Sequence, residues 1–292
     1  TPTWGSNFVT HDAWEAYGQA SAVNNNFPFT QIVGSTDATH LRIIPTTAIQ
    51  GGPDVAAAPA KQIAAYTIGR GELLQLSQKD RLAGSILVAD KPVGLWGGNG
   101  CALIPTNQAA CDSIHQQQLP IRKAGAEYVG ARFPNRTDKE PLTPYTIVGM
   151  VDGTTLTYDE KPNGAPTTLG EGQIARFFTD KQFSVASQDP DHPFTLTGFM
   201  TGCASVTSKE ACDFATGDAH GGDPEMVAMI PWLQYLSTYL FVADPTYANT
   251  ALVFVRKKNF QNTFDDVTLD CSGLVTGWTP VGTAGRFEVA KL

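Results

Sequence analysis

The residues whose types are best suited to binding or chemistry lie together in one acidic loop. Four carboxylates and a histidine occur there among glycines: Asp213, Asp218, His220, Asp223 and Glu225. Hard cations such as Ca²⁺ bind several oxygen ligands from a flexible loop, so this composition indicates a calcium site. The spacing does not match the EF-hand pattern, and a solvated acidic loop would have the same composition. Calcium is therefore the single cofactor that the sequence suggests, and otherwise none is expected.

Four of the five cysteines form two evenly placed pairs. Cys101 and Cys111 are ten residues apart, and Cys203 and Cys212 are nine apart, at equivalent places in two similar segments. This recurrence predicts the disulfides Cys101–Cys111 and Cys203–Cys212. A metal site is the alternative, but no C-x-x-C occurs and no histidine stands at ligand spacing from a cysteine. Disulfides favour an oxidising compartment, and Cys271 is left over.

One further group of residues has types suited to acid–base chemistry. His192 lies beside Asp189 and Asp191, and an Asp–His pair can transfer protons. The corresponding turn at 90–92 has the aspartate and proline without a histidine, so turn formation explains both residues. No nucleophile elbow, zinc-protease motif or phosphate-binding loop is present in the sequence. We therefore expect no enzyme, with a glycan-active hydrolase that uses paired carboxylates as the alternative.

Three aromatic residues near the amino terminus are candidates for stacking on a ligand. Trp4, Trp14 and Tyr17 lie in a stretch without clear periodicity, which favours exposed positions. Aromatic side chains in β proteins serve more often for packing. The sequence leaves both interpretations open.

The composition excludes some partners. The chain has 292 residues with 28 Asp and Glu against 20 Lys and Arg, so its net charge is −8. Nucleic acids and anionic membranes attract basic surfaces, so neither is an expected partner. No apolar run approaches the roughly 20 residues of a membrane-spanning helix, so no membrane insertion is expected.

An internal repeat organises the chain. Residues 69–112 contain a Gly-Glu turn, an apolar run interrupted by Asp and Pro, and two cysteines, and residues 169–213 repeat this order. Weaker matches extend the repeat to both ends. They define unit 1 (1–120), unit 2 (121–232) and a partial third unit (233–292) that stops before the Asp–Pro strand pair. Either the other units supply the missing strand or the chain is a piece of a longer protein. We favour the second alternative.

Short segments rich in Val, Ile, Thr, Phe and Tyr between Gly, Pro, Asn and Asp predict many strands. They lie at 39–44, 64–68, 73–76, 85–89, 93–96, 145–150, 154–158, 174–178, 183–186, 194–199, 239–242 and 251–256. The turns at 90–92 and 189–193 are expected to close hairpins. Helix is expected only at 224–236 and, as a short one, at 109–118. The fold class is all-β: tandem β-sandwich or jelly-roll-like units with internal repeats and little helix.

The motifs of unit 1 also carry a family resemblance. It rests on the run LAGSILVADKPVGLWGGNGC at 82–101, the CD pair at 111–112 and the run GAEYV at 125–129. These resemble the family of domains related to the amino-terminal region of the IgG Fc-binding protein. The similarity covers most of the chain, most specifically residues 60–200. It implies a β-rich extracellular binding or adhesive module, which in bacterial members is typically secreted or surface-exposed. No catalytic residue is carried over, and IgG binding itself is not transferred.

We therefore expect an extracellular or cell-surface adhesion module that binds a glycan, matrix or cell-surface ligand as part of a larger modular protein. A structural spacer or assembly module is the alternative, and an extracellular hydrolase is less expected. Exposed aromatic residues around a groove would favour the binder. Apolar interfaces between units would favour the spacer. Two carboxylates that face each other in a cleft would favour the hydrolase.

Overall fold

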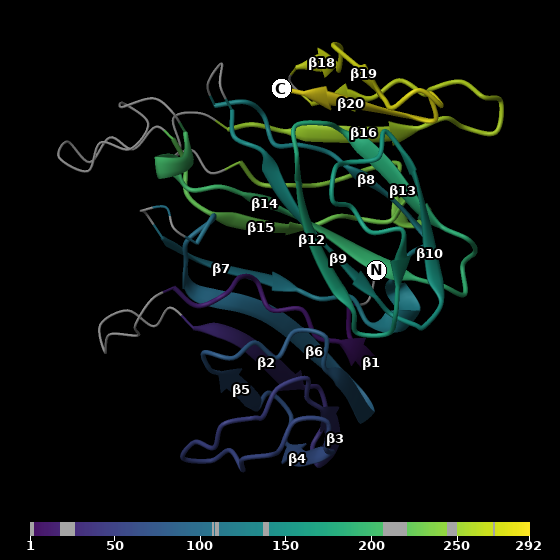
Figure 1. The fold of residues 1–292 in the computed structure, drawn as a ribbon. Helices are drawn as coiled ribbons and strands as arrows, with labels where there is room; N and C mark the ends of the chain where they lie inside the picture. The colour runs from purple at the N-terminus through teal and green to yellow at the C-terminus, as the bar shows by residue number, and fades with distance from the viewer. Residues whose placement is uncertain are drawn as a thin grey trace.

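The computed structural model describes residues 3–17, 27–106, 108, 111–136, 140–206, 221–243, 250–270 and 272–292. Within these ranges the secondary structure is almost entirely β (Figure 1), which confirms the expected fold class. Three short 3₁₀-helices accompany the strands: η1 (Ile121–Lys123), η2 (Cys203–Ser205) and η3 (Trp232–Gln234).

Unit 1 forms one seven-stranded sheet. Its strands are β1 (Gly5–Val9), β2 (Pro28–Gly34), β3 (Thr39–Ile44), β4 (Ala64–Ile68), β5 (Leu73–Ser77), β6 (Ile86–Ala102) and β7 (Asp112–Gln117). The long strand β6 pairs with β1 and β3 in its first part and with β2 and β7 in its second part. Both parts contribute buried side chains to one core, among them Leu87 and Leu95.

Unit 2 divides the same arrangement between two sheets. Its strands are β8 (Glu127–Gly130), β9 (Thr143–Gly149), β10 (Thr154–Asp159), β11 (Thr168–Leu169), β12 (Ile174–Thr179), β13 (Phe183–Ser187), β14 (Phe194–Met200) and β15 (Glu225–Ala228). The sheet orders are β11-β10-β13-β8 and β12-β9-β14-β15. These orders match the orders of paired strands β4-β3-β6-β1 and β5-β2-β6-β7 in unit 1. Strands β13 and β14 take the places of the first and second parts of β6. The internal repeat of the sequence is thus a repeat of topology.

The two predicted hairpins are wrong. Residues 90–92 lie inside the continuous strand β6, and residues 189–193 connect β13 to β14 in the opposite sheet. Pro92 is tolerated within a strand because it stands where the pairing of β6 passes from β3 to β2, so its missing N–H interrupts neither ladder. Beside this point, the His40 N–H donates a hydrogen bond to the Asp90 carboxylate at 2.8 Å.

The two predicted helices are also wrong. The segment 109–118 contains β7, which pairs with β6 and buries Ile114. The segment 224–236 contains β15, which pairs with β14 and buries Met226, followed by η3 after Pro231. In both segments, pairing with a distant strand outweighs the local preference for helix.

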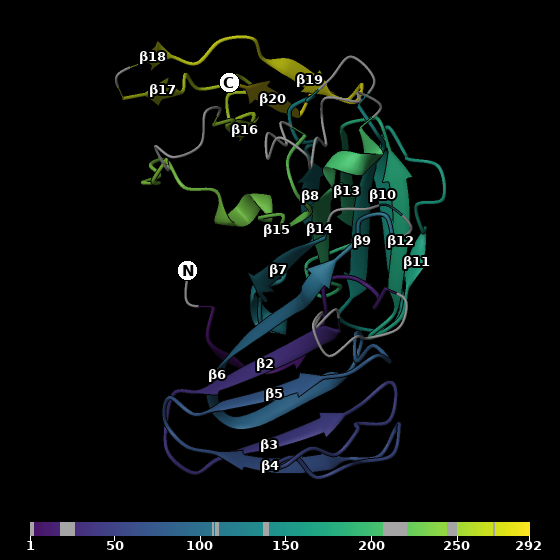
Figure 2. The same cartoon turned by 90° about the vertical axis from the view of Figure 1, so that its left-hand side faces the viewer.

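Unit 3 is incomplete in the described structure. A three-stranded sheet has the order β16-β20-β19, and a separate pair joins β17 to β18. Their bounds are β16 (Val253–Lys257), β17 (Thr268–Leu269), β18 (Gly273–Leu274), β19 (Thr279–Val281) and β20 (Phe287–Lys291). The three-stranded sheet lies beyond β8 at one end of unit 2 (Figure 2), where Phe287 and Val289 pack against Val129. The bounds of the three repeat units at 120 and 232 stay a prediction.

Candidate functional site

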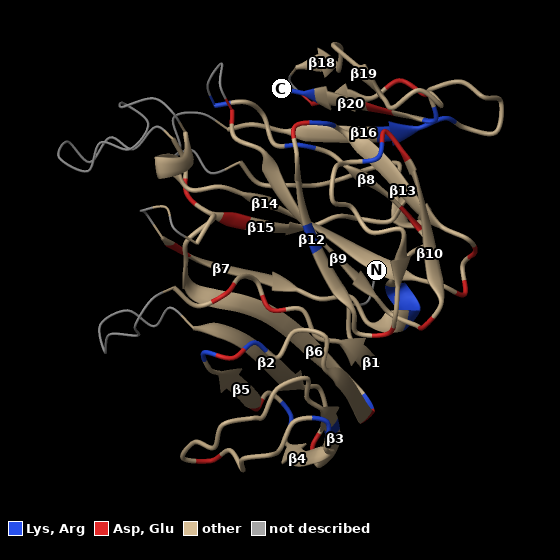
Figure 3. Cartoon of the chain, in the orientation of Figure 1, with Lys and Arg blue, Asp and Glu red and all other residues tan. Residues whose placement is uncertain are grey.

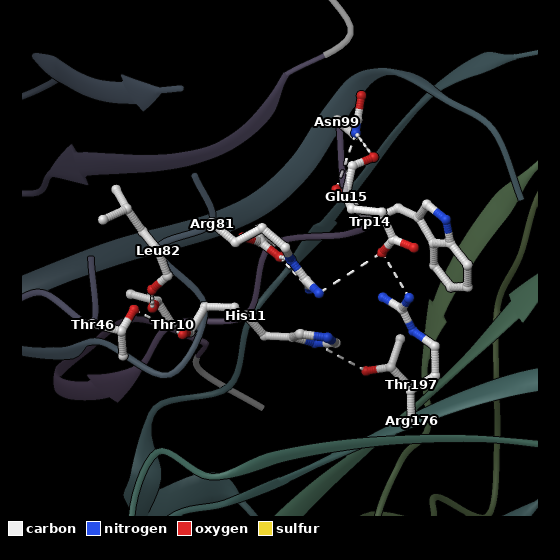
Figure 4. Close-up of polar contacts among 12 residues, drawn as sticks. Thr10, His11, Trp14, Glu15, Thr46, Arg81, Leu82, Asn99, Arg176 and Thr197 are labelled. Carbon is white, nitrogen blue, oxygen red and sulfur yellow. Dashed lines mark hydrogen bonds and ion pairs between the residues drawn. The ribbon is translucent and has the colours of Figure 1, made fainter. Parts of the chain in front are cut away.

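Buried polar side chains gather where the amino-terminal segment 10–15 crosses between units 1 and 2 (Figure 4). Asp12 is 1% exposed, and its Oδ1 accepts a hydrogen bond from Nε of Arg81 at 2.7 Å. Burial raises the pKa of Asp12, although the guanidinium of Arg81 opposes that shift. Around this pair, Val9 packs against Val148 and forms an apolar contact between the units.

A second ion pair connects the same segment to β12. Arg176 donates to Glu15 Oε2 at 2.7 Å, and its guanidinium lies 3.5 Å from the centroid of the Trp14 ring. The Thr106 hydroxyl donates to Glu15 Oε1 at 2.6 Å and accepts from Trp14 Nε1 at 2.9 Å. Burial alone would raise the pKa of Glu15, but the hydrogen bonds from Thr106 and Arg176 outweigh it and lower the pKa.

His11 stands between these two pairs. Its backbone is clamped by Gln118, whose Oε1 accepts from the His11 N–H at 2.8 Å. Its Nδ1 is 3.5 Å from the Thr197 hydroxyl, and its buried Nε2 has no hydrogen-bond partner within the described residues. Burial lowers the pKa of His11 to about 3, with Arg81 and Arg176 adding to the shift. A histidine with this pKa is neutral at neutral pH.

Two hollows border this polar junction. A cavity of about 30 Å³ is lined by His11, Gln118 and Thr197, among others. A wider hollow of about 290 Å³ opens beside Arg81 and Arg176, whose charges are balanced by Asp12 and Glu15. Because Asp12 is paired with Arg81 and Glu15 with Arg176, these ion pairs hold segment 10–15 against both units.

The three predicted stacking residues are not brought together. Trp14 was expected to be exposed, and this is wrong: its ring is buried at the junction, covered by Arg176 and by Phe199 at 5.1 Å between centroids. Trp4 is partly buried and packs edge-on against Trp96 at 6.3 Å. Tyr17 is the one of the three with an exposed ring.

The predicted acidic loop is only partly described. Asp213, Asp218 and His220 lie outside the described residues, while Asp223 precedes β15 and Glu225 is its first residue. Burial raises the pKa of Asp223, and the neighbouring carboxylate of Asp112 adds to the shift. No group of three or more His, Cys, Asp or Glu that could hold a metal occurs in the described ranges. The calcium hypothesis stays a prediction.

The predicted disulfide Cys101–Cys111 is confirmed. It connects the end of β6 to the start of β7, where the register of the two strands shifts between Asn99 and Ala102. Cys212 lies outside the described residues, so the pair Cys203–Cys212 stays a prediction, and Cys271 is likewise not described.

Removing the confirmed disulfide should destabilise unit 1. We expect the double substitution Cys101→Ser and Cys111→Ser to lower the free energy of unfolding by about 2–3 kcal/mol, because the crosslink restricts the unfolded chain. Urea unfolding of both proteins without reductant measures the difference. Detection of free thiols at both positions by peptide mapping of the native, non-reduced protein would contradict the assignment.

The loop at 258–267, between β16 and β17, was not among the sites predicted from the sequence. The equivalent connections in units 1 and 2 are short, at 35–38 and 150–153, so this loop is an insertion. Phe260 is fully exposed in it. The signal in the sequence was the extra length of unit 3 at this point, together with an aromatic residue among polar ones.

Hydrogen bonds from Asn259 order this loop. Its Oδ1 accepts from the N–H groups of Gln261 at 3.0 Å and Thr263 at 3.1 Å, and its Nδ2 donates to Asp265 at 2.8 Å. Asn262 adopts a left-handed φ of 62°, which asparagine tolerates better than most residues. The backbone beside Phe260 is therefore held by side-chain contacts within the loop.

Contacts of Arg256 also hold the base of the loop. The Arg256 guanidinium lies 3.9 Å from the centroid of the Trp278 ring and 5.0 Å from that of Phe264. It also donates to Glu288 Oε2 from Nε at 3.0 Å and from Nη2 at 2.7 Å. Figure 3 shows basic residues at the end of β16, where the loop begins. The loop that carries the exposed Phe260 thus begins beside stacked aromatic and cationic groups.

Two repeated β-sandwich units, a partial third unit and a local disulfide define a tandem β-repeat protein. A sequence profile of the family described as IgGFc binding protein matches residues 1–292. The chain belongs to this family, as the motifs of unit 1 indicated. Searches of curated proteins and of solved structures found no match. The family match does not bear on a bacterial source, which stays a prediction. In the described part of the chain, no helix has the length and apolar character needed to cross a membrane.

Proposed function

We propose that this chain is an extracellular adhesion module that binds a protein on a cell surface or in a matrix, and that the loop at 258–267 makes the central contact. The observation that carries this is the full exposure of Phe260 on a loop ordered by Asn259. Large apolar surface on an ordered loop binds with little loss of conformational entropy. Aromatic and arginine residues are also the commonest binding hot spots.

Other features support this proposal. Membership of the IgGFc-binding family favours a protein ligand. The Cys101–Cys111 disulfide favours an oxidising, extracellular environment. The ion pairs of Asp12 with Arg81 and of Glu15 with Arg176 give these carboxylates a structural role, which favours a binding function over catalysis. The ligand in the family description is not assumed for this chain, so IgG Fc is one probe among several.

The experiment measures binding of the chain to immobilised IgG Fc, mucin and collagen by biolayer interferometry. We expect saturable binding to at least one of them and a dissociation constant at least tenfold larger for Phe260→Ala. The melting temperature of this variant should stay unchanged, because Phe260 has no core contacts to lose.

Tyr17→Ala is the matched control, since it removes an exposed aromatic residue from unit 1. Unchanged binding by this control supports the proposal. Weaker binding by Tyr17→Ala with normal binding by Phe260→Ala would move the contact surface to the amino-terminal segment and overturn the proposal. Absence of binding to every probe would overturn the binding function.

A specific observation favours the second candidate, a spacer or assembly module. Several large apolar side chains of the segment 230–242 are exposed, including Leu233, Leu240 and Val242. Exposed apolar surface of this kind is typical of faces that contact other polypeptide. Loss of probe binding together with coverage of the face at 230–242 by another polypeptide would favour this function.

A further inference from the structure

The mostly covered arginines of this chain differ in how many of their guanidinium nitrogens are bonded. Arg136 donates from Nε and Nη2 to Glu140 at 2.9 and 2.6 Å. Its Nη1 donates to the carbonyls of Thr201 and Gly221 at 2.6 and 2.7 Å. Arg256 likewise donates from all three nitrogens. In these two arginines every guanidinium nitrogen has an acceptor, as is usual for covered polar groups.

Arg81 and Arg176, which line the hollow of about 290 Å³ between units 1 and 2, are bonded less completely. Arg81 donates from Nε to Asp12 Oδ1 at 2.7 Å, and its Nη2 lies 2.5 Å from the same oxygen. Its Nη1 is 3.9 Å from Glu15 Oε2, which is beyond hydrogen-bond distance. Arg176 donates from Nη1 to Glu15 Oε2, but its Nε has no hydrogen-bond partner within the described residues. The two guanidinium groups therefore keep N–H donors that lack an acceptor in the described part of the chain.

The two carboxylates at this junction are held in place by contacts that they already make. Glu15 Oε1 accepts from the Thr106 hydroxyl at 2.6 Å while Oε2 accepts from Arg176. Figure 4 shows the Glu15 carboxylate joined by dashed lines to both guanidinium groups. Asp12 is 1% exposed and fixed against Arg81. Further acceptors for the two arginines would therefore have to come from the hollow.

The electrostatic environment favours a negative group as the source of these acceptors. Burial lowers the pKa of Arg176, and the charge of Arg81 adds to this shift although Glu15 opposes it. A lowered pKa means that the cationic form of Arg176 is less stable here than in water, so a further anion in contact with it is stabilising. Hydrogen bonds between a guanidinium and a carboxylate are also stronger than bonds between neutral groups.

The walls of the hollow limit the size and chemistry of a ligand. Besides the two arginines it is lined by Ala83 of unit 1 and Ile174 of unit 2. Sites for small molecules typically combine apolar walls with a few polar groups in this way. The Trp14 ring lies 3.5 Å from the Arg176 guanidinium, and Asp12 fixes that of Arg81. Because both groups are already held, a ligand would bind with little loss of side-chain entropy.

We propose that the hollow between Arg81 and Arg176 is a binding site for a small organic carboxylate. The ligand's carboxylate accepts hydrogen bonds from the remaining N–H groups of both arginines, since the planar guanidinium matches the geometry of a carboxylate. Its carbon skeleton contacts Ala83 and Ile174. Because one arginine belongs to unit 1 and the other to unit 2, the bound ligand connects the two units and stabilises their contact.

Butyrate and glucuronate are the probes for this site, and butyramide and glucose are their uncharged controls. We expect at least one of the acids to shift the Nε–H NMR signals of Arg81 and Arg176 saturably and to raise the melting temperature. The signal of Arg136 should not move, because its guanidinium is fully bonded. Tighter binding of glucuronate indicates a sugar acid as the ligand, and tighter binding of butyrate an apolar acid. Absence of a shift with both acids, or equal shifts with the uncharged controls, overturns the proposal.

Ala83→Leu tests the hollow without removing a charge. We expect at least tenfold weaker binding of the acid, because the larger side chain fills the hollow while both ion pairs remain. Ala60→Leu, at an exposed alanine elsewhere in unit 1, is the matched control and should bind normally. Arg176→Lys keeps the charge but loses the planar guanidinium, so it should also weaken binding. Binding by Ala83→Leu and Arg176→Lys as tight as that of the wild type overturns the proposal. Phe260→Ala should bind the acid normally, so this test is independent of the proposed function.

Discussion

Replacing Asp12 by alanine is expected to lower the free energy of unfolding by about 3–5 kcal/mol. Asp12 is 1% exposed and its carboxylate faces Arg81, which is itself mostly covered. Removing one partner of a buried ion pair leaves the other charge desolvated without compensation. The junction between units 1 and 2 is built around this pair, so the loss weakens both the pair and the contact between units.

Chemical denaturation of Asp12→Ala against the wild type measures this effect. Glu160→Ala is the matched control, because Glu160 forms an exposed pair with Lys181 at 2.9 Å. Exposed pairs are typically worth less than about 1 kcal/mol. Asp12→Asn keeps the side-chain shape, so its loss of unfolding free energy should lie between those of Asp12→Ala and Glu160→Ala. Equal effects of Asp12→Ala and Glu160→Ala would contradict the buried ion pair as a major stabilising contact.

The second large effect is a loss of stability in acid that originates at His11. Burial, Arg81 and Arg176 lower its pKa in the folded chain from 6.5 to about 3. Between these values the unfolded chain binds the proton and the folded chain does not, so the free energy of unfolding falls as pH falls. We expect His11 to account for a loss of up to about 4 kcal/mol over that window.

Other titrating groups at the junction require a variant that isolates His11. The lowered pKa of Glu15 adds to the acid loss, whereas the raised pKa of Asp12 acts in the opposite direction. His11→Gln keeps an acceptor near Thr197 but does not titrate. Unfolding free energies of both proteins measured from pH 7 to pH 4 should converge as pH falls. Parallel curves would show that His11 is accessible or protonated in the folded chain.

The residues at the junction illustrate what sequence reasoning can and cannot find. Trp14, Glu15 and Asp12 lie in an irregular segment, and nothing near them in the chain indicates burial. Their partners Arg81 and Arg176 are distant in sequence, and Arg176 belongs to another unit. Burial of Trp14 under Arg176 is consequently a property of how the units pack, and stacking on a ligand was the wrong interpretation.

Strand prediction succeeded where local features decide the conformation. Strands β3 and β4 have the bounds expected from alternating apolar residues between turn residues. It failed at 90–92 and 109–118, where the outcome depends on which distant strand is the neighbour. At 239–242 a sequence suited to a strand has no described neighbour and forms none.

By itself, the sequence determined that the chain is all-β, that it repeats, that Cys101 pairs with Cys111 and that it belongs to its family. These properties depend on side-chain type, alternation and turn residues, which act over a few positions along the chain. Only the tertiary structure decided that β6 pairs with two different sets of strands, that His11 is buried and neutral, and that Phe260 and Leu240 are exposed. Strand pairing, burial and electrostatic environment arise from contacts between distant residues, and no local pattern records them.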